Sequence, residues 1–174
     1  QSFAVDYATT CKDGGFGPFM QPCHNKGHGL TLAAAPLKSD TEYTGHGIAD
    51  IWISAPTKDA NLFLYVEDVA PDGSVRVVTE GRLKAKVRKL GTAPWALPNI
   101  PWHRSYAEDA QDLTPNVPAQ MVFEIMPTSW VFKKGHRIQI TLTGADWRER
   151  ARDADAQPAA ITVISDAAHP SKVT

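Results

Sequence analysis

The sequence has little cysteine, almost no net charge and no long apolar run. No apolar stretch approaches the roughly 20 residues that a membrane-spanning helix needs. The formal net charge of −1 creates no overall field that would attract nucleic acid or anionic lipid. The first residues, QSFAVDYATT, lack the basic and apolar segments of a signal peptide. We therefore expect neither nucleic acid nor a membrane among the partners of this chain.

Sequence motifs of catalysis are also missing. No serine lies in the Gly-x-Ser-x-Gly pattern that exposes the nucleophile of an α/β-hydrolase, and no glycine-rich phosphate loop follows a strand. The carboxylate pairs Glu67-Asp68 and Glu108-Asp109 are adjacent, and neighbours on a strand point to opposite faces. We expect these four to be solvated surface or turn residues. The sequence therefore predicts no catalytic residue and no cofactor within the chain.

The two cysteines, Cys11 and Cys23, bracket an 11-residue loop, and His24 and His28 follow them. Three interpretations stay open: a disulfide, free thiols, or a metal site whose spacing matches no known zinc motif. A disulfide is favoured, with no metal bound, and closing such a loop is worth about 3 kcal/mol in the chain-entropy model. It would imply an oxidising compartment and hence a secreted or periplasmic protein.

What the sequence does contain is a series of short strands. Apolar and polar residues alternate with the two-residue period of a pleated strand, and Pro71-Asp72-Gly73 has the composition of a hairpin turn. No helical period of useful length is present. Seven strands punctuated by Gly and Pro predict one antiparallel β-sandwich domain, with strands at 30–34, 51–53, 62–66, 75–80, 120–125, 137–143 and 161–163.

The strand at 62–66 is apolar at every position, so both of its faces must be covered. A second sheet would cover one face. We expect a partner domain to cover the other, which would leave apolar surface exposed in the isolated chain.

Two segments are not strands. Residues 12–29 are rich in Gly, Pro, His and Cys, and residues 91–112 form an excursion rich in Pro and Trp. Loops longer than about 12–15 residues are usually functional or disordered. Trp95 and Trp102 favour a packed segment, because exposing two indole rings to water is unfavourable. The excursion packs either on its own sandwich or on a partner domain.

An ordered series of sequence blocks covers nearly the whole chain: VDYATT (5–10), LTLAAAPLKSDTEYTGHG (30–47), ANLFLYVEDVAPDGSVRVVTEGRL (60–83), PWHRSYAEDA (101–110), PTSWVFKKGHRIQITLTGAD (127–146) and ITVISDAAHPSKV (161–173). This series resembles the C-terminal non-catalytic domain of the Xaa-Pro dipeptidyl-peptidase (S15) and CocE/NonD superfamily of serine hydrolases. The Cys/His-rich loop at 11–28 departs from the pattern.

The resemblance implies an all-β fold, a galactose-binding-like jelly-roll β-sandwich of two antiparallel sheets with long loops. It implies that residues 1–174 are a single C-terminal domain of a larger protein. The Ser-Asp-His triad would lie in an upstream α/β-hydrolase domain, which is the expected partner and would bring a small ester or peptide substrate.

The resemblance also suggests site residues. By position, the loop after residue 10 can complete one wall of the substrate pocket, with Phe16, Phe19 and Met20 as candidate lining residues. Packing under their own loop is the alternative. The side-chain types enriched at interface cores supply candidates for contact with the catalytic domain: Trp95, Trp102, Arg104 and Tyr106.

Three functions remain to be distinguished. The first is an accessory domain of a serine hydrolase, without catalysis of its own. The second is an autonomous carbohydrate-binding module, because jelly rolls often stack sugars on exposed aromatic rings and fold alone does not decide function. The third, least favoured, is a small metalloenzyme that uses His24 and His28.

Overall fold

The computed structural model describes residues 1–7, 29–95, 99–146 and 158–174. These residues form nine β-strands and two single turns of 3-10 helix, so the all-β prediction is confirmed. None of the described helices has the length and apolar character needed to cross a membrane.

The strands are β1 (Ser2–Ala4), β2 (Leu30–Ala33), β3 (Thr41–Ser54), β4 (Asn61–Val69), β5 (Val75–Lys84), β6 (Ala119–Phe132), β7 (Arg137–Thr143), β8 (Ala160–Ile164) and β9 (Lys172–Val173). The turns are η1 (Ala85–Val87) and η2 (Ala107–Asp109). All seven predicted strands are present. β3 and β6 are longer than predicted, at 14 residues each, and β1 and β9 were not predicted.

The predicted hairpin turn joins β4 to β5. Gly73 adopts a positive φ of 85°, which glycine accepts without a steric penalty. The backbone N–H and the hydroxyl of Ser74 both donate to Oδ1 of Asp72, at 2.9 and 2.7 Å. The carboxylate of Asp72 thus closes the turn by binding the residue two positions further on, which is why Asp is common in turns.

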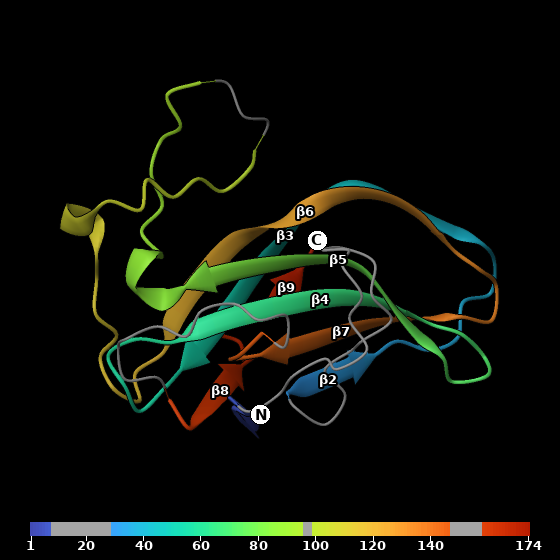
Figure 1. The fold of residues 1–174 in the computed structure, drawn as a ribbon, viewed down its shortest axis with the longest axis horizontal. Coiled ribbons are helices and arrows are strands. Elements are labelled where there is room, and N and C mark those ends of the chain that lie inside the picture. Colours follow the sequence, from blue (N-terminus) through green and yellow to red (C-terminus); the bar gives the residue numbers. More distant parts are fainter. Residues whose placement is uncertain (8–28, 96–98, 147–157) are drawn as a thin grey trace.

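All strand pairs are antiparallel and belong to one sheet, in the order β1-β8-β3-β6-β5-β4-β7-β2, with β9 paired to β3 (Figure 1). The prediction of two separate sheets is therefore wrong in this respect. However, β5 and β6 are joined only at the pair Gly81–Ile125. The sheet consists of a first half (β1, β8, β3, β6, with β9) and a second half (β5, β4, β7, β2) that meet at this point.

Glycine is required at the junction between the halves. A Cβ atom on Gly81 would lie 2.5 Å from the carbonyl oxygen of Glu124 and 3.1 Å from the ring of Phe123. No side chain fits in that space. Because Gly81 has none, the backbones of β5 and β6 approach closely enough to pair.

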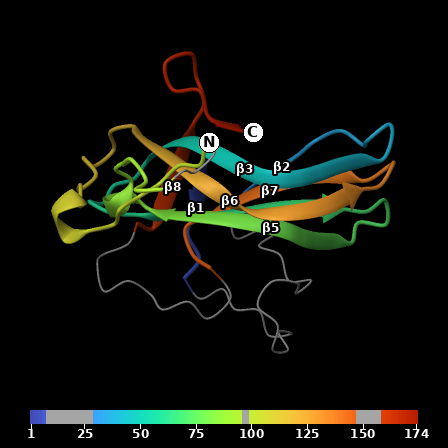
Figure 2. The same cartoon turned by 90° about the horizontal axis from the view of Figure 1, so that it is seen from above.

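One cluster of buried apolar side chains forms the core, and the two halves of the sheet are seen as layers in Figure 2. The alternation read from the sequence matches the buried positions, because each strand turns every second residue inward. The first half contributes Ala49, Ile51, Ile53, Met121, Phe123 and Ile125, and the second half contributes Leu62, Leu64, Val66 and Leu142.

The outer face of β4 is covered within this chain, which contradicts the expected exposure of apolar surface at 62–66. Tyr65 is only 1% exposed and Phe63 is half-buried. The next outward residue is Glu67, which is fully buried. Its Oε2 accepts hydrogen bonds from Nε2 of Gln139 and from the hydroxyl of Thr141, both at 2.7 Å.

Candidate domain-interface loop

Residues 88–95 and 99–112, which we call the interface loop, lie between β5 and β6 in the chain and project from the sheet (Figure 1). The two ends of the loop are pinned together at its base. The guanidinium of Arg88 donates to the carbonyl oxygens of Ala85 and Gln111. The N–H of Gln111 donates to the carbonyl of Lys86 at 2.8 Å. Burial lowers the pKa of Arg88, which arginine tolerates without losing its charge.

Farther from the sheet, the outgoing and returning segments of the loop stay in contact. The N–H of Gly91 donates to the carbonyl of Trp102 at 2.9 Å. The rings of Trp95 and Trp102 meet edge to face, with centroids 6.0 Å apart and planes at 76°. This is one of the favoured arrangements of aromatic pairs.

A buried carboxylate holds the returning part of the loop. Asp109 accepts a hydrogen bond from Nε of Arg104 at 2.5 Å and one from Nζ of Lys89 at 2.8 Å. These two bonds, that from Arg104 above all, lower the pKa of Asp109 from 3.8 to about 2. Arg104 also pairs with Glu108 at 3.1 Å and lies over the ring of Tyr106, 4.7 Å from its centroid.

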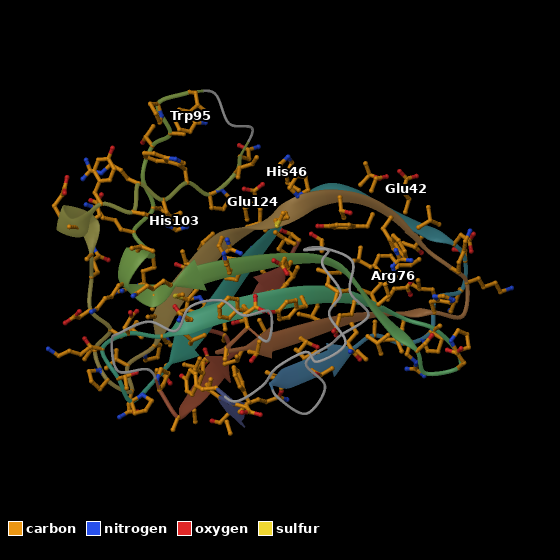
Figure 3. The ribbon with its side chains drawn as sticks, in the orientation of Figure 1. Glu42, His46, Arg76, Trp95, His103 and Glu124 are labelled. Carbon is orange, nitrogen blue, oxygen red and sulfur yellow. The ribbon has the colours of Figure 1, made fainter. Side chains whose placement is uncertain are left out.

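His103 connects the interface loop to the sheet. Its Nε2 lies 2.8 Å from the carbonyl oxygen of Val122 on β6, and its Nδ1 lies 3.2 Å from the carbonyl oxygen of Lys89. Figure 3 shows His103 where the loop meets β6 and Trp95 on the outer part of the loop.

The four candidate interface residues differ in their surroundings. Trp102 is half-buried, and Arg104 pairs with neighbouring acids while its side chain stays 40% exposed. Trp95 and Tyr106 are 58% and 57% exposed, and Leu90 of the same loop is 50% exposed. The loop is thus fixed by its own contacts while three of its apolar side chains face solvent.

The adjacent carboxylates depart from the expectation of solvated positions. Glu67, Asp68 and Asp109 are buried, and only Glu108 is exposed. The sequence offered no signal for this, because burial of an acid depends on hydrogen-bond donors that are distant in the chain. Glu67 and Asp68 do point to opposite faces of β4, as the strand period requires.

Away from the interface loop, Asp68 lines a cleft of about 550 Å³ between the β4–β5 hairpin and the end of β6. Its carboxylate accepts from Nε1 of Trp130 at 3.0 Å and lies 2.8 Å from Nδ1 of His136. Ser74 lines the same cleft, but its hydroxyl donates to Asp72. This Ser, His and Asp therefore do not form a catalytic relay.

No described part of the chain brings together three or more His, Cys, Asp or Glu side chains that could hold a metal ion. The remaining candidates from the sequence fall outside the described residues. They are the pocket candidates Phe16, Phe19 and Met20, and the Cys/His cluster of Cys11, Cys23, His24 and His28.

Comparison with known proteins gives a family match along almost the entire chain. The family described as "X-Pro dipeptidyl-peptidase C-terminal non-catalytic domain" matches residues 3–174. Two curated relatives are "Putative serine esterase Mb1866c" of Mycobacterium bovis and "Putative serine esterase MT1883" of Mycobacterium tuberculosis. Each is 40% identical over 118 residues, which are 67% of this chain and 19% of the relative.

Solved structures share the fold. An alpha-amino acid ester hydrolase superposes with a TM-score of 0.73 and 16% identity, covering 99% of this chain and 31% of that chain. A CocE/NonD family hydrolase from Staphylococcus aureus superposes with a TM-score of 0.68 and 14% identity, covering 99% of this chain and 35% of that one. The chain thus corresponds to a minor part of each similar protein.

Proposed function

Because the chain belongs to the family of X-Pro dipeptidyl-peptidase C-terminal non-catalytic domains, we propose that it supports the α/β-hydrolase domain of a serine hydrolase. The chain is an accessory C-terminal domain, and the catalytic domain belongs to the same polypeptide. The substrate is a small ester or peptide, which fits the serine esterase and ester hydrolase names of the similar proteins.

The interface loop is the single observation that carries the docking role. Its base and middle are held by Arg88, Asp109 and His103, so its shape does not depend on a partner. It nevertheless exposes Trp95 and Tyr106, two residue types that dominate the energy of protein interfaces. In this proposal these two side chains contact the catalytic domain, while Trp102 and Arg104 keep them in position.

Three finer features complete the proposal. The two half-sheets that meet at Gly81 favour a jelly-roll sandwich of the galactose-binding-like type. Phe16, Phe19 and Met20 would line the substrate pocket, and Cys11 and Cys23 would form a disulfide. These last two assignments rest on the family resemblance and on the spacing of the cysteines.

The test uses the catalytic domain encoded upstream in the parent gene, mixed with the 174-residue chain. Trp95→Ala and Tyr106→Ala should each weaken association about fivefold or more, because truncating an interface anchor costs over about 1 kcal/mol. Val131→Ala, which truncates an exposed apolar side chain on β6, is the control and should bind like the wild type. Unchanged binding by both loop variants would refute docking through the loop.

A carbohydrate-binding module is the second candidate, and the exposed ring of Trp95 on a projecting loop favours it. Titration calorimetry against common polysaccharides separates the two functions. Millimolar or tighter binding that Trp95→Ala abolishes would support the module. If no polysaccharide gives a binding heat, the carbohydrate-binding function is rejected and the accessory-domain function is retained.

A further inference from the structure

An apolar groove of about 410 Å³ lies between the edges of the two half-sheets that do not pair. Both halves contribute apolar side chains to its lining: Ile51, Val163 and Val173 from the first half, and Leu32, Ile140 and Leu142 from the second. Three of the six belong to the core cluster, whereas Leu32 and Val173 are 47% and 37% exposed. A segment lying in this groove would therefore pack directly on the core.

One wall of the groove has an open backbone edge. β8 pairs with residues 52–54 of β3 and β9 pairs with residues 49–50, so β8 and β9 follow one another along the same side of β3. β1 covers the other edge of β8, but among the described strands β9 pairs with β3 alone. Thr174 and Ile48 exchange two hydrogen bonds, so the alternation of an antiparallel ladder turns the N–H and C=O of Val173 away from β3.

The direction of β1 leads to this open edge. The amino group of Gln1 donates to the carbonyl of Val163, and the N–H of Val163 donates to the carbonyl of Gln1, both at 2.8 Å. The β1–β8 ladder thus continues to the first residue of the chain. Gln1 itself lines the groove, together with Ser165 and Ser171, which lie between β8 and β9 in the chain. Figure 1 shows the N-terminus between β8 and β2. A strand continued backwards from Gln1 would follow β8 towards β9.

We propose that the residues immediately upstream of Gln1 extend β1 as a strand along β9 and lay apolar side chains in the groove. This inference rests on the proposed function, in which the catalytic domain precedes Gln1 in the same polypeptide. Phe3 is buried and Ser2 is exposed, so the strand period places the second and fourth residues upstream of Gln1 on the inward face. These two residues should be apolar in the parent protein.

Strand addition suits both features of the groove. The backbone of the added strand satisfies the open edge of β9, and its inward side chains fill the apolar space. An uncovered edge beside apolar side chains is a site where other chains can pair, and proteins usually cover such edges. The added strand would also fix the direction in which the polypeptide arrives from the catalytic domain.

Hydrogen exchange in two proteins of different length tests the proposal. One protein is the 174-residue chain, and the other begins about eight residues earlier in the parent gene, enough for one strand. The Val173 amide should exchange at least about tenfold more slowly in the longer protein, because its N–H then has a backbone partner. The Gly73 amide, which donates to Ala70 in the β4–β5 turn, should exchange equally in both. Equal exchange of Val173 in the two proteins would refute the added strand.

Two variants of the longer protein test the packing in the groove. Leu32→Asp puts a charge on the groove wall and should return Val173 to the fast exchange of the 174-residue chain. Leu90→Asp, at an exposed position of the interface loop, is the control and should keep the slow exchange. Slow exchange in Leu32→Asp would contradict packing of the strand in the groove. If that variant does not fold, the two unsubstituted lengths decide the matter.

Sedimentation of the longer protein excludes a different occupant. The added strand should protect Val173 in the monomer. Protection that appears only when the protein dimerises would assign the groove to a second copy and refute the proposal. Neither measurement involves the catalytic domain or Trp95, so failure here is distinguishable from failure of the proposed docking.

Discussion

Glu67 is a carboxylate fully buried on the outer face of β4, where it accepts hydrogen bonds from Gln139 and Thr141. Replacing it with alanine leaves both buried donors without their acceptor. We expect Glu67→Ala to lower the free energy of unfolding by about 1–3 kcal/mol in denaturant titrations. Glu42→Ala, at an exposed position on β3, should change it by less than about 0.5 kcal/mol. Equal effects of the two substitutions would contradict this account.

Asp109 should make the free energy of unfolding depend on pH in the acid range. Hydrogen bonds from Arg104 and Lys89 lower its pKa from 3.8 to about 2. A lowered carboxylate pKa contributes stability that is present above the unfolded value and is lost as the pH falls through the folded value. Asp109→Asn should therefore be less stable than the wild type at about pH 5, and the difference should vanish as the pH approaches about 2.

Unfolding free energies of both proteins across this range measure the effect. Glu108→Gln, which alters the exposed neighbour, is the control and should show a smaller difference. A constant gap between wild type and Asp109→Asn down to about pH 2 would show that the ion pairs do not contribute.

At the scale of elements, the junction between β5 and β6 depends on the single pair Gly81–Ile125. Gly81→Ala would place a methyl group 2.5 Å from the carbonyl of Glu124. Because overpacking shifts backbone, we expect a loss of about 1–3 kcal/mol in unfolding free energy. Hydrogen exchange should accelerate at this junction while the β4–β7 pair keeps its protection. Uniform exchange throughout the sheet would argue against a local junction.

The strands illustrate what local sequence pattern can predict. β4, β5 and β7 were predicted because their apolar residues alternate or run together. The first half of β3 was not, because Thr41–Gly47 contributes polar side chains and two glycines, with an irregular register between Gly45 and Gly47. β1 and β9 pair with strands far away in the chain, and two or three residues carry no period.

The interface loop was predicted less completely than the strands. Its Trp and Pro content predicted a packed excursion, whereas the loop projects from the sheet and Trp95 is 58% exposed. The side-chain types enriched at interfaces supplied Trp95, Trp102, Arg104 and Tyr106 as candidates. The roles of Arg88, His103 and Asp109 were not predicted. Their partners are backbone carbonyls and charges that only the folded chain brings together. The loop sequence has no repeating pattern of apolar residues, so such contacts could not be predicted from it.

At the scale of the whole molecule, the described residues contain no serine hydrogen-bonded to a histidine that also contacts a carboxylate. We expect the purified 174-residue chain to release no nitrophenol from nitrophenyl esters and no nitroaniline from Xaa-Pro nitroanilides. The upstream catalytic domain, assayed alongside, provides the positive control. Turnover by the chain that persists through repeated purification would overturn the assignment of catalysis to another domain.

The fixed shape of the interface loop has a kinetic consequence. Since Arg88, Asp109 and Arg104 set its conformation in advance, a partner does not have to wait for the loop to fold. When the two domains are supplied as separate chains, their encounter should then be governed by diffusion and orientation, and little chain entropy is lost on contact. Substitutions that free the base of the loop should slow capture of the neighbouring domain, whereas truncation of Trp95 should hasten its escape.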